Sequence, residues 1–225
     1  EESFEGASIR PLTVPLLVES ESWLLVGSAV GSIRRLARRG SRRRRMQEAE
    51  ERVRGRRPDR SRACVARVLR RLRRRAPTGA LTIRTDRKSS YATLIPEVLG
   101  TRTTHHTVSG SDERTAANPL FPVNLTIAMS RDNCGRLRRQ SWLHAKTADG
   151  LRAQLLVYTA YRNYVRMRFN RDEPWQSPAW FLGLAPRALQ WEEALRWRQD
   201  WGQNSISPIR RKAITMVGTL RRACA

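Results

Sequence analysis

Asp86 is the carboxylate whose surroundings best suit metal or phosphate chemistry. It directly follows the β-branched run 81–85, and Lys88 and Tyr91 lie just beyond it. A carboxylate at the carboxyl end of a strand, on the rim of an α/β sheet, is a common position for binding Mg²⁺ and phosphate groups. An aspartate in this setting also commonly caps a helix or closes a turn, and that alternative stays open.

His105 and His106 are adjacent within a second β-branched run, 103–108. Neighbouring side chains of a strand point to opposite faces, so these two rings do not easily share one ion. No cysteine or further histidine lies at metal-ligand spacing. Phosphate-loop, GxGxxG and serine-nucleophile motifs are absent, which leaves kinase, NTPase and dinucleotide-binding functions without support.

Arginines interleave with aromatic residues between positions 131 and 175. Guanidinium groups contact phosphates and aromatic rings stack on bases or sugars, so this mixture is typical of nucleic-acid binding. The residues that we expect to contact nucleic acid in this part of the chain are Arg131, Arg136, Arg138, Arg139, Trp142, Lys146 and Arg162. Tyr158 and Tyr161 fit a protein core better.

The stretch 118–146 must position most of these cations. Pro119 and Pro122 suit the start of a helix, and no further breaker occurs before Gly135. The apolar positions of the predicted buried stripe are Leu125, Ala128, Met129, Gly135 and Leu137. The arginines fall on the opposite face, and a surface helix with solvated arginines is the alternative interpretation.

The first half of the chain begins with β-rich runs at 3–5, 13–18 and 23–27, which predict a three-strand meander. Residues 34–57 are strongly basic and poor in apolar side chains, which predicts an exposed basic loop with a helical middle at 46–53. A helix follows Pro58. Its predicted inward stripe consists of Ala63, Val65, Val68, Leu69 and Leu72.

Further along, we expect a strand at 81–85, a helix at 89–98 and a strand at 103–108. A second amphipathic helix is predicted for 148–169, and a short one for 190–197. The inward residues expected for the longer helix are Leu151, Leu155, Tyr158 and Val165. The element order predicts a mixed α/β layer.

The chain carries 44 basic and 20 acidic residues, a net charge of +24. Such an excess favours polyanionic partners, either nucleic acid or an anionic membrane surface. No apolar run reaches membrane-spanning length, so we expect no membrane insertion. Three cysteines without CxxC spacing are typical of a reduced, intracellular protein. The first residue is Glu1, and we expect the reading frame to start upstream of it.

Five blocks in order resemble bacterial insertion-sequence transposases of the DDE type: TDRKSSY, HHTVSG, NPLFPVN…RDNCGRLRRQSWLHAK, AYRNYVR and SPAWFLGL. The resemblance covers residues 3–185. It implies an RNase H-like mixed α/β sheet flanked by helices, with an arginine-rich insertion and a helical C-terminal extension. The implied segments are the first strands (1–33), the basic loop (34–57), the rest of the catalytic core (58–147), C-terminal helices (148–203) and a tail (204–225).

In that family three carboxylates hold two Mg²⁺ ions, which activate water and then a 3′-hydroxyl for attack on DNA phosphodiesters. The resemblance places the second carboxylate at Asp86, with Lys88 as a DNA contact beside it. The third acid aligns with Asn124, whose amide oxygen can coordinate Mg²⁺ but brings no charge. The first would lie upstream of Glu1. The acids nearest to the third position are Asp112, Glu113 and Asp132.

The resemblance therefore implies a DNA transposase or a remnant of one, inactive as this fragment. The implied partners are element-end and target DNA, bound by a homo-oligomer in the nucleoid region of a bacterial cytoplasm. The alternative is a non-catalytic basic nucleic-acid-binding protein, in which Asp86 is a cap and Asn124 a packing residue. A ribosome-associated protein would fit the charge but not the order of the motifs.

Overall fold

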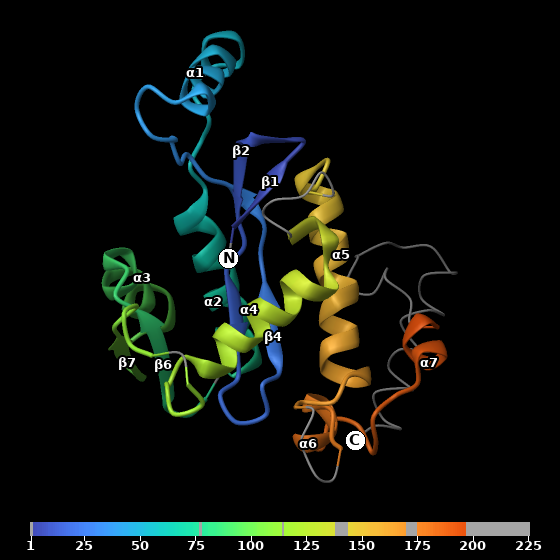
Figure 1. Cartoon of the computed structure of the whole chain (residues 1–225). Coiled ribbons are helices and arrows are strands. Elements are labelled where there is room, and N and C mark those ends of the chain that lie inside the picture. Colours follow the sequence, from blue (N-terminus) through green and yellow to red (C-terminus); the bar gives the residue numbers. More distant parts are fainter. Residues whose placement is uncertain (1, 77, 114, 138–143, 170–174, 197–225) are drawn as a thin grey trace, which may run out of the picture. The chain divides into compact units, whose positions relative to one another are not determined.

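The computed structural model describes residues 2–76, 78–113, 115–137, 144–169 and 175–196 of a mixed α/β protein (Figure 1). The chain forms two compact units: unit 1 is Glu1–Ser20 with Leu25–Tyr158, and unit 2 is Glu21–Leu24 with Thr159–Ala225. In the described part of the chain, no helix has the length and apolar character needed to cross a bilayer.

Unit 1 contains most of the regular structure. Its elements are β1 (Glu2–Glu5), β2 (Ala7–Thr13), β3 (Leu16–Val18), β4 (Leu25–Ser28), β5 (Gly31–Ser32), α1 (Arg42–Arg54), α2 (Ser61–Arg75), β6 (Leu81–Asp86), α3 (Ser89–Leu99), β7 (Thr103–Val108), α4 (Phe121–Asn133), the 3₁₀ turn η1 (Gly135–Leu137) and most of α5 (Ala148–Ala160). Unit 2 contains the π-helical turn η2 (Tyr161–Val165), α6 (Pro178–Phe181) and α7 (Trp191–Leu195).

The first five strands form one antiparallel meander. β2 pairs with β1 and β5, while β3 pairs with β4. The pairs Thr13↔Gly31 and Leu16↔Ser28 share one register, and the Ala29 N–H donates to the Pro15 carbonyl between them (3.3 Å). β2–β3 and β4–β5 are therefore the two arms of one hairpin, and the predicted meander agrees with this.

The third strand of the meander begins later than predicted. The expected start, Trp23, has φ +61°, a left-handed conformation that ends an extended strand. β4 accordingly starts at Leu25. The Trp23 ring packs edge-on against Phe169 within unit 2, with ring centroids 5.6 Å apart, so the tip of this hairpin contributes to the second unit.

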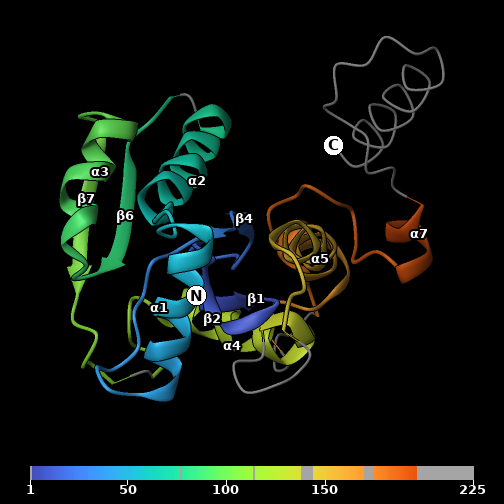
Figure 2. The same cartoon turned by 90° about the horizontal axis from the view of Figure 1, so that it is seen from above.

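A hydrophobic core lies between α2, α3 and the strand β6 (Figure 2). The predicted stripe of α2 is confirmed, except that Ala63 is exposed. The buried residues of this core are Ala66, Leu69, Ile83, Leu94, Ile95, Val98 and Leu99. Pro96 lies inside α3, as predicted.

β6 and β7 pair in parallel through the crossover helix α3, which confirms the predicted strand–helix–strand order. His105 is half-buried and its Nε2 lies 2.8 Å from the Thr85 hydroxyl, whereas His106 is exposed, so the two rings do lie on opposite faces. Among the described residues this pair forms a separate two-stranded sheet. The single mixed sheet that the resemblance implies is not formed there.

The buried stripe predicted for 118–146 is confirmed at Leu137, which is buried in η1, but it is wrong for the helix α4 itself. The helix buries Thr126 and Ser130, while Ala128 is exposed and Leu125 and Met129 are only half-buried. The Thr126 hydroxyl donates to the Pro122 carbonyl and the Ser130 hydroxyl to the Ile127 carbonyl, both at 2.8 Å. Hydroxyls satisfied inside their own helix can be buried, and α4 packs against β3.

The helix predicted for 148–169 is also shorter than expected. α5 ends at Ala160 and continues only as the π-helical turn η2. Leu151, Leu155 and Tyr158 are buried as predicted, but Val165 is half-buried. In unit 2 the short helix α7 confirms the last predicted helix, with Gln190 and Glu193 forming a capping box at its start.

Candidate nucleic-acid interface

Asp86 and its neighbours come together at the turn between β6 and α3. Asp86 is exposed, and its Oδ1 accepts the Lys88 backbone N–H at 3.3 Å. The Lys88 ammonium lies 5.8 Å from the centre of the Tyr91 ring. Burial, and to a smaller extent the charge of Asp86, raise the pKa of Tyr91. Asp86 therefore closes a turn before α3, which is the alternative that the sequence left open.

The residues expected to hold metal do not fit a two-ion site in the described part of the chain. No group of three or more His, Cys, Asp or Glu side chains is placed there to hold an ion. Asn124 is half-buried on α4, and Asp112, Glu113 and Asp132 are exposed. One exposed carboxylate and one neutral amide leave most of the charge of two Mg²⁺ ions uncompensated.

The cations predicted to contact DNA have different surroundings. Lys88 and Lys146 are exposed, and Arg131 is half-buried. Arg136 is exposed, but its Nη1 donates to the Gly150 carbonyl at 2.8 Å, so part of its guanidinium stabilises the start of α5. Three further predicted residues lie outside the described part of the chain: Arg138, Arg139 and Trp142.

Arg162 is not a surface residue. Its exposed fraction is 0%. From the π-helical turn η2, its guanidinium donates to the carbonyls of Met167 (3.5 Å) and Arg168 (3.2 Å). These bonds stabilise the turn that follows η2 inside unit 2, and they leave no accessible face for DNA. The prediction of a DNA contact at Arg162 is corrected to a structural role.

A different set of arginines gathers on α2. Arg67, Arg70 and Arg74 are exposed and follow the i, i+3, i+7 spacing of one helix face. None of the described carboxylates forms an ion pair with them. Beside them, Arg71 donates to the Ser28 carbonyl at 2.8 Å and Arg75 to the Val26 carbonyl, which joins α2 to β4.

The electrostatics of Arg71 show how concentrated this charge is. Burial lowers the pKa of its guanidinium, and the positive charges of Arg75, Arg67, Arg74 and Arg152 lower the pKa further. Arg152 reaches this site from α5, where it pairs with Asp149. We call Arg67, Arg70, Arg71, Arg74, Arg75 and Arg152 the guanidinium cluster.

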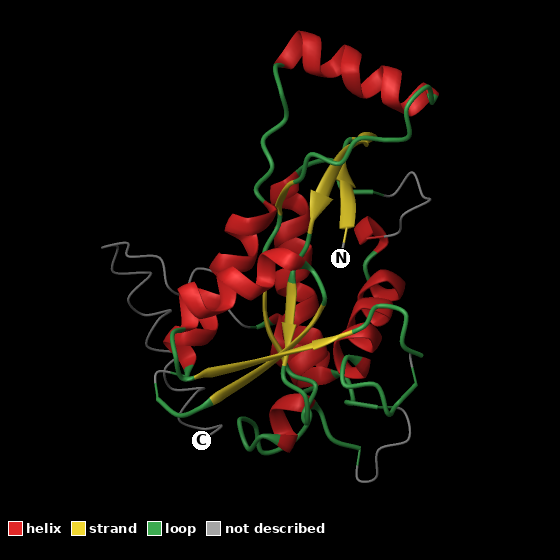
Figure 3. Cartoon of the chain, turned by 90° about the vertical axis from the view of Figure 1, so that its left-hand side faces the viewer, coloured by secondary structure: helices red, strands yellow, loops and turns green. Residues whose placement is uncertain are grey.

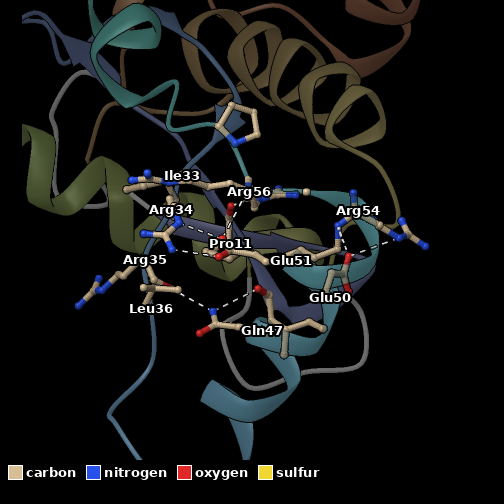
Figure 4. A pocket seen from close by; sticks show the side chains of 15 residues that line it. Pro11, Ile33, Arg34, Arg35, Leu36, Gln47, Glu50, Glu51, Arg54 and Arg56 are labelled. Carbon is tan, nitrogen blue, oxygen red and sulfur yellow. Dashed lines mark hydrogen bonds and ion pairs between the residues drawn. The ribbon is translucent and has the colours of Figure 1, made fainter.

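The remaining arginine-rich region behaves differently. Figure 4 shows the pocket between β2, α1 and the segments that flank α1. Arg34 forms a two-pronged ion pair with Glu51 (2.9 Å for each contact), and this pair lowers the pKa of the Glu51 carboxyl. Arg10 pairs with Glu5 and Glu50. Four of the six arginines that line the pocket, Arg10, Arg34, Arg54 and Arg57, pair with glutamates, so it suits an anion less well than the exposed row of α2 does.

The periodicity of α2 already placed its arginines opposite the apolar stripe, yet the sequence did not single them out as a site. The i, i+3, i+7 spacing of Arg67, Arg70 and Arg74 was the available signal. The contribution of Arg152 had no local signal, since it depends on α5 packing near α2. Comparison with protein-family models, curated proteins and solved structures finds no match to this chain.

Proposed function

We propose that this protein binds DNA as a protein of the DDE-transposase type, with the guanidinium cluster as its phosphate-binding surface. The observation that carries the proposal is the exposed row Arg67, Arg70 and Arg74, which has no ion-pair partner among the described carboxylates. Repulsion among these cations costs stability unless a polyanion compensates it. The lowered pKa of Arg71 supports the same conclusion.

The row also has a suitable length. From Arg67 to Arg74 the helix rises roughly 10 Å, and over the same length of duplex axis each DNA strand carries about three phosphates. Arginine suits this role because its planar fork can donate two hydrogen bonds to one phosphate. Contacts of this kind position a protein on DNA and carry no sequence information by themselves.

The affinity test compares two double variants that remove equal charge. Arg67→Gln/Arg74→Gln changes the exposed row, whereas Arg62→Gln/Arg187→Gln changes exposed arginines that already pair with Glu97 and Glu193. Fluorescence anisotropy with a labelled duplex, over a salt series, is the measurement. For the first variant we expect at least a tenfold loss of DNA affinity. Its slope of log K against log salt should be smaller in magnitude than that of the wild type by about 2.

The control variant should bind within about threefold of the wild type, because its arginines are already compensated. Equal losses in both variants would mean that net charge alone drives binding, and the assignment of the cluster would be wrong. No measurable binding of the wild type at low salt would remove the proposal altogether.

The catalytic part of the family's activity is a separate proposal. By resemblance, Asp86 would take part in Mg²⁺-dependent strand cleavage and transfer at the ends of a mobile element. A nicking assay with Mg²⁺ or Mn²⁺ on duplexes bearing terminal inverted repeats tests this. We expect binding without cleavage by this chain. Robust cleavage that Asp86→Ala abolishes would show instead that the chain retains a complete metal site.

A further inference from the structure

Helix α1 has one face that is committed to unit 1. Gln47 is buried, and its Nε2 donates to the carbonyls of Ile9 (3.2 Å) and Arg35 (3.1 Å), while its Oε1 accepts the Ala37 N–H (2.8 Å). One turn further on, Glu51 pairs with Arg34. These contacts fix which side of α1 turns toward β2 and which side turns toward solvent.

The solvent face of α1 combines arginines with an apolar stripe. Met46, Ala49 and Val53 follow the i, i+3, i+7 spacing and are exposed, Met46 to 47% and Val53 to 85%. Three exposed arginines accompany the stripe: Arg42, Arg45 and Arg52. Figures 1 and 3 show α1 standing clear of the other helices of unit 1, at the end of two extended segments.

The acidic residues of α1 form ion pairs with arginines of unit 1. Glu48 pairs with Arg44 at 2.6 Å, and Glu50 pairs with Arg10 at 3.4 Å and with Arg54 at 3.8 Å. The first turn of the helix contains no acidic residue. No ion pair is formed by Arg42, Arg45 or Arg52 with a described carboxylate. The solvent face of α1 is therefore cationic and partly apolar at the same time.

We propose that α1 enters the major groove of duplex DNA with this face, Arg42, Arg45 and Arg52 on the phosphates and Met46 and Val53 on base edges. This inference rests on the proposed DNA binding and adds the element that reads the duplex. The major groove admits one α-helix. The 13 residues of α1 extend roughly 20 Å, so the helix can lie along the groove.

Other occupants fit this face less well. A second copy of the helix would bring like charges together, which opposes self-association. A membrane surface is bound by helices with a broad apolar face rich in Trp, Phe or Leu. The stripe of α1 has three apolar residues, one of which is Ala49, and no aromatic residue. Thymine methyl groups in the major groove are apolar contacts of suitable size.

Two double variants test the expected phosphate contacts and the expected base contacts separately. Arg45→Gln/Arg52→Gln removes cations, and Met46→Gln/Val53→Gln removes apolar side chains without changing the charge. All four positions are exposed, and circular dichroism verifies that helix content is unchanged. Each variant is measured by anisotropy on an A·T-rich duplex and on the same duplex with uracil in place of thymine, which lacks only the methyl groups.

For the wild type we expect uracil to weaken binding by about fourfold for each methyl group that is in contact. Met46→Gln/Val53→Gln should bind the thymine duplex about as weakly as the wild type binds the uracil duplex, and should not distinguish the two. Arg45→Gln/Arg52→Gln should bind both duplexes about tenfold more weakly than the wild type and should still prefer the thymine duplex. The α2 variant Arg67→Gln/Arg74→Gln should also keep this preference.

The outcomes separate the two proposals. If the α2 variant binds weakly while both α1 variants behave as the wild type, α1 does not enter the groove, and the proposed DNA binding stands. The groove assignment is wrong if uracil substitution leaves the affinity of the wild type unchanged. It is also wrong if the wild type binds single-stranded DNA more tightly than the duplex. Binding to anionic phosphatidylserine vesicles that is lost in Met46→Gln/Val53→Gln would reassign the face to lipid. Failure of every variant to change affinity would overturn both proposals.

Discussion

Gln47 is the side chain that most strongly constrains α1, because an uncharged amide is buried and uses both of its polar atoms. Its three hydrogen bonds reach β2 and the segment that precedes α1. Buried polar groups are tolerated only when they are bonded in this way, and removing one partner leaves the others unsatisfied. Together with the Glu51–Arg34 pair, Gln47 thus sets the orientation of a helix that otherwise consists mainly of charged side chains.

Gln47→Ala should therefore destabilise unit 1 by roughly 1–3 kcal/mol, because the carbonyls of Ile9 and Arg35 and the Ala37 N–H lose their partner. Urea unfolding monitored by circular dichroism measures the change. Met46→Ala, one residue earlier on the exposed side of the same helix, is the control and should change stability by less than about 0.5 kcal/mol. Equal effects would mean that the bonds of Gln47 do not hold α1 in place.

Glu193 shows how local bonds control a carboxyl group in unit 2. Hydrogen bonds from Arg187 and from the Gln190 backbone lower the pKa of Glu193 to about 2. The folded pKa lies below the ordinary value of 4.5, so the charged form is favoured by folding. This contribution to stability is present above pH 4.5 and is lost as the pH falls toward 2.

We expect Arg187→Gln to raise the pKa of Glu193 by more than Arg196→Gln does, because Arg187 donates directly whereas Arg196 acts only through space. Carboxyl ¹³C shifts of Glu193, followed by NMR from pH 1.5 to 6, provide the measurement. An unchanged titration midpoint in Arg187→Gln would contradict the assigned cause.

At the scale of elements, the contact between α2 and β5 sets how closely the guanidinium cluster approaches the meander. Gly31 lies against Cys64 of α2, and a Cβ at position 31 would lie 2.4 Å from the Cys64 Sγ. Such a separation is shorter than atoms can tolerate, so a side chain at position 31 would force the Cys64 side chain or the helix that carries it to shift. Glycine is needed here for space.

Gly31→Ala should cost about 1–3 kcal/mol of unfolding free energy, as overpacking of a buried contact generally does. The cost should be smaller in a Cys64→Ala background, where the clashing sulfur is missing. Thermal and urea unfolding of the four proteins in this double-mutant cycle measure the coupling. Gly110→Ala is the control, since a Cβ there meets nothing within 4 Å. Additive effects of the two substitutions would exclude the clash as the cause.

At the scale of the whole molecule, the large positive net charge affects the stability of the folded state. The net charge of +24 creates self-repulsion that disfavours the compact state. Around α1 four glutamates pair with arginines, whereas the arginines on the solvent faces of α1 and α2 form no ion pair with a described carboxylate. Each unit has its own packing: unit 2 includes the stacked rings of Tyr161 and Trp191, 4.7 Å apart.

Added salt should raise the melting temperature, because screening weakens the repulsion between like charges. Differential scanning fluorimetry between 50 and 500 mM NaCl tests this, and duplex DNA at low salt should raise it as well by binding the folded state. Without DNA, Arg67→Gln/Arg74→Gln should have a higher melting temperature than the wild type. Added DNA should raise the melting temperature of this variant by less than it raises that of the wild type. A melting temperature that falls with salt would show that attractive pairs outweigh the repulsion.

Metal removal should leave DNA binding unchanged, since guanidinium–phosphate contacts need no divalent ion. Anisotropy titrations in EDTA and in 5 mM MgCl₂, at matched ionic strength, compare the two conditions. Affinity that is at least tenfold higher with Mg²⁺ and that is lost in Asp86→Ala would point instead to a metal-dependent complex at the end of β6.

The sequence by itself determined the elements whose signals are local. The helix α2 and the strands β6 and β7 were predicted, because apolar spacing and β-branched runs depend on neighbours a few residues away. Asp86 was also correctly seen as a possible turn residue, and the meander followed from alternating runs and polar turns.

Only the tertiary structure decided which faces and charges matter. Thr126 and Ser130 are buried on α4 in place of the predicted apolar residues, because their hydroxyls form hydrogen bonds within the helix. Arg162 became a buried donor because nearby carbonyls converge on it. The cluster of α2 with Arg152 arises from residues distant in sequence, and their mutual repulsion exists only once the chain has folded.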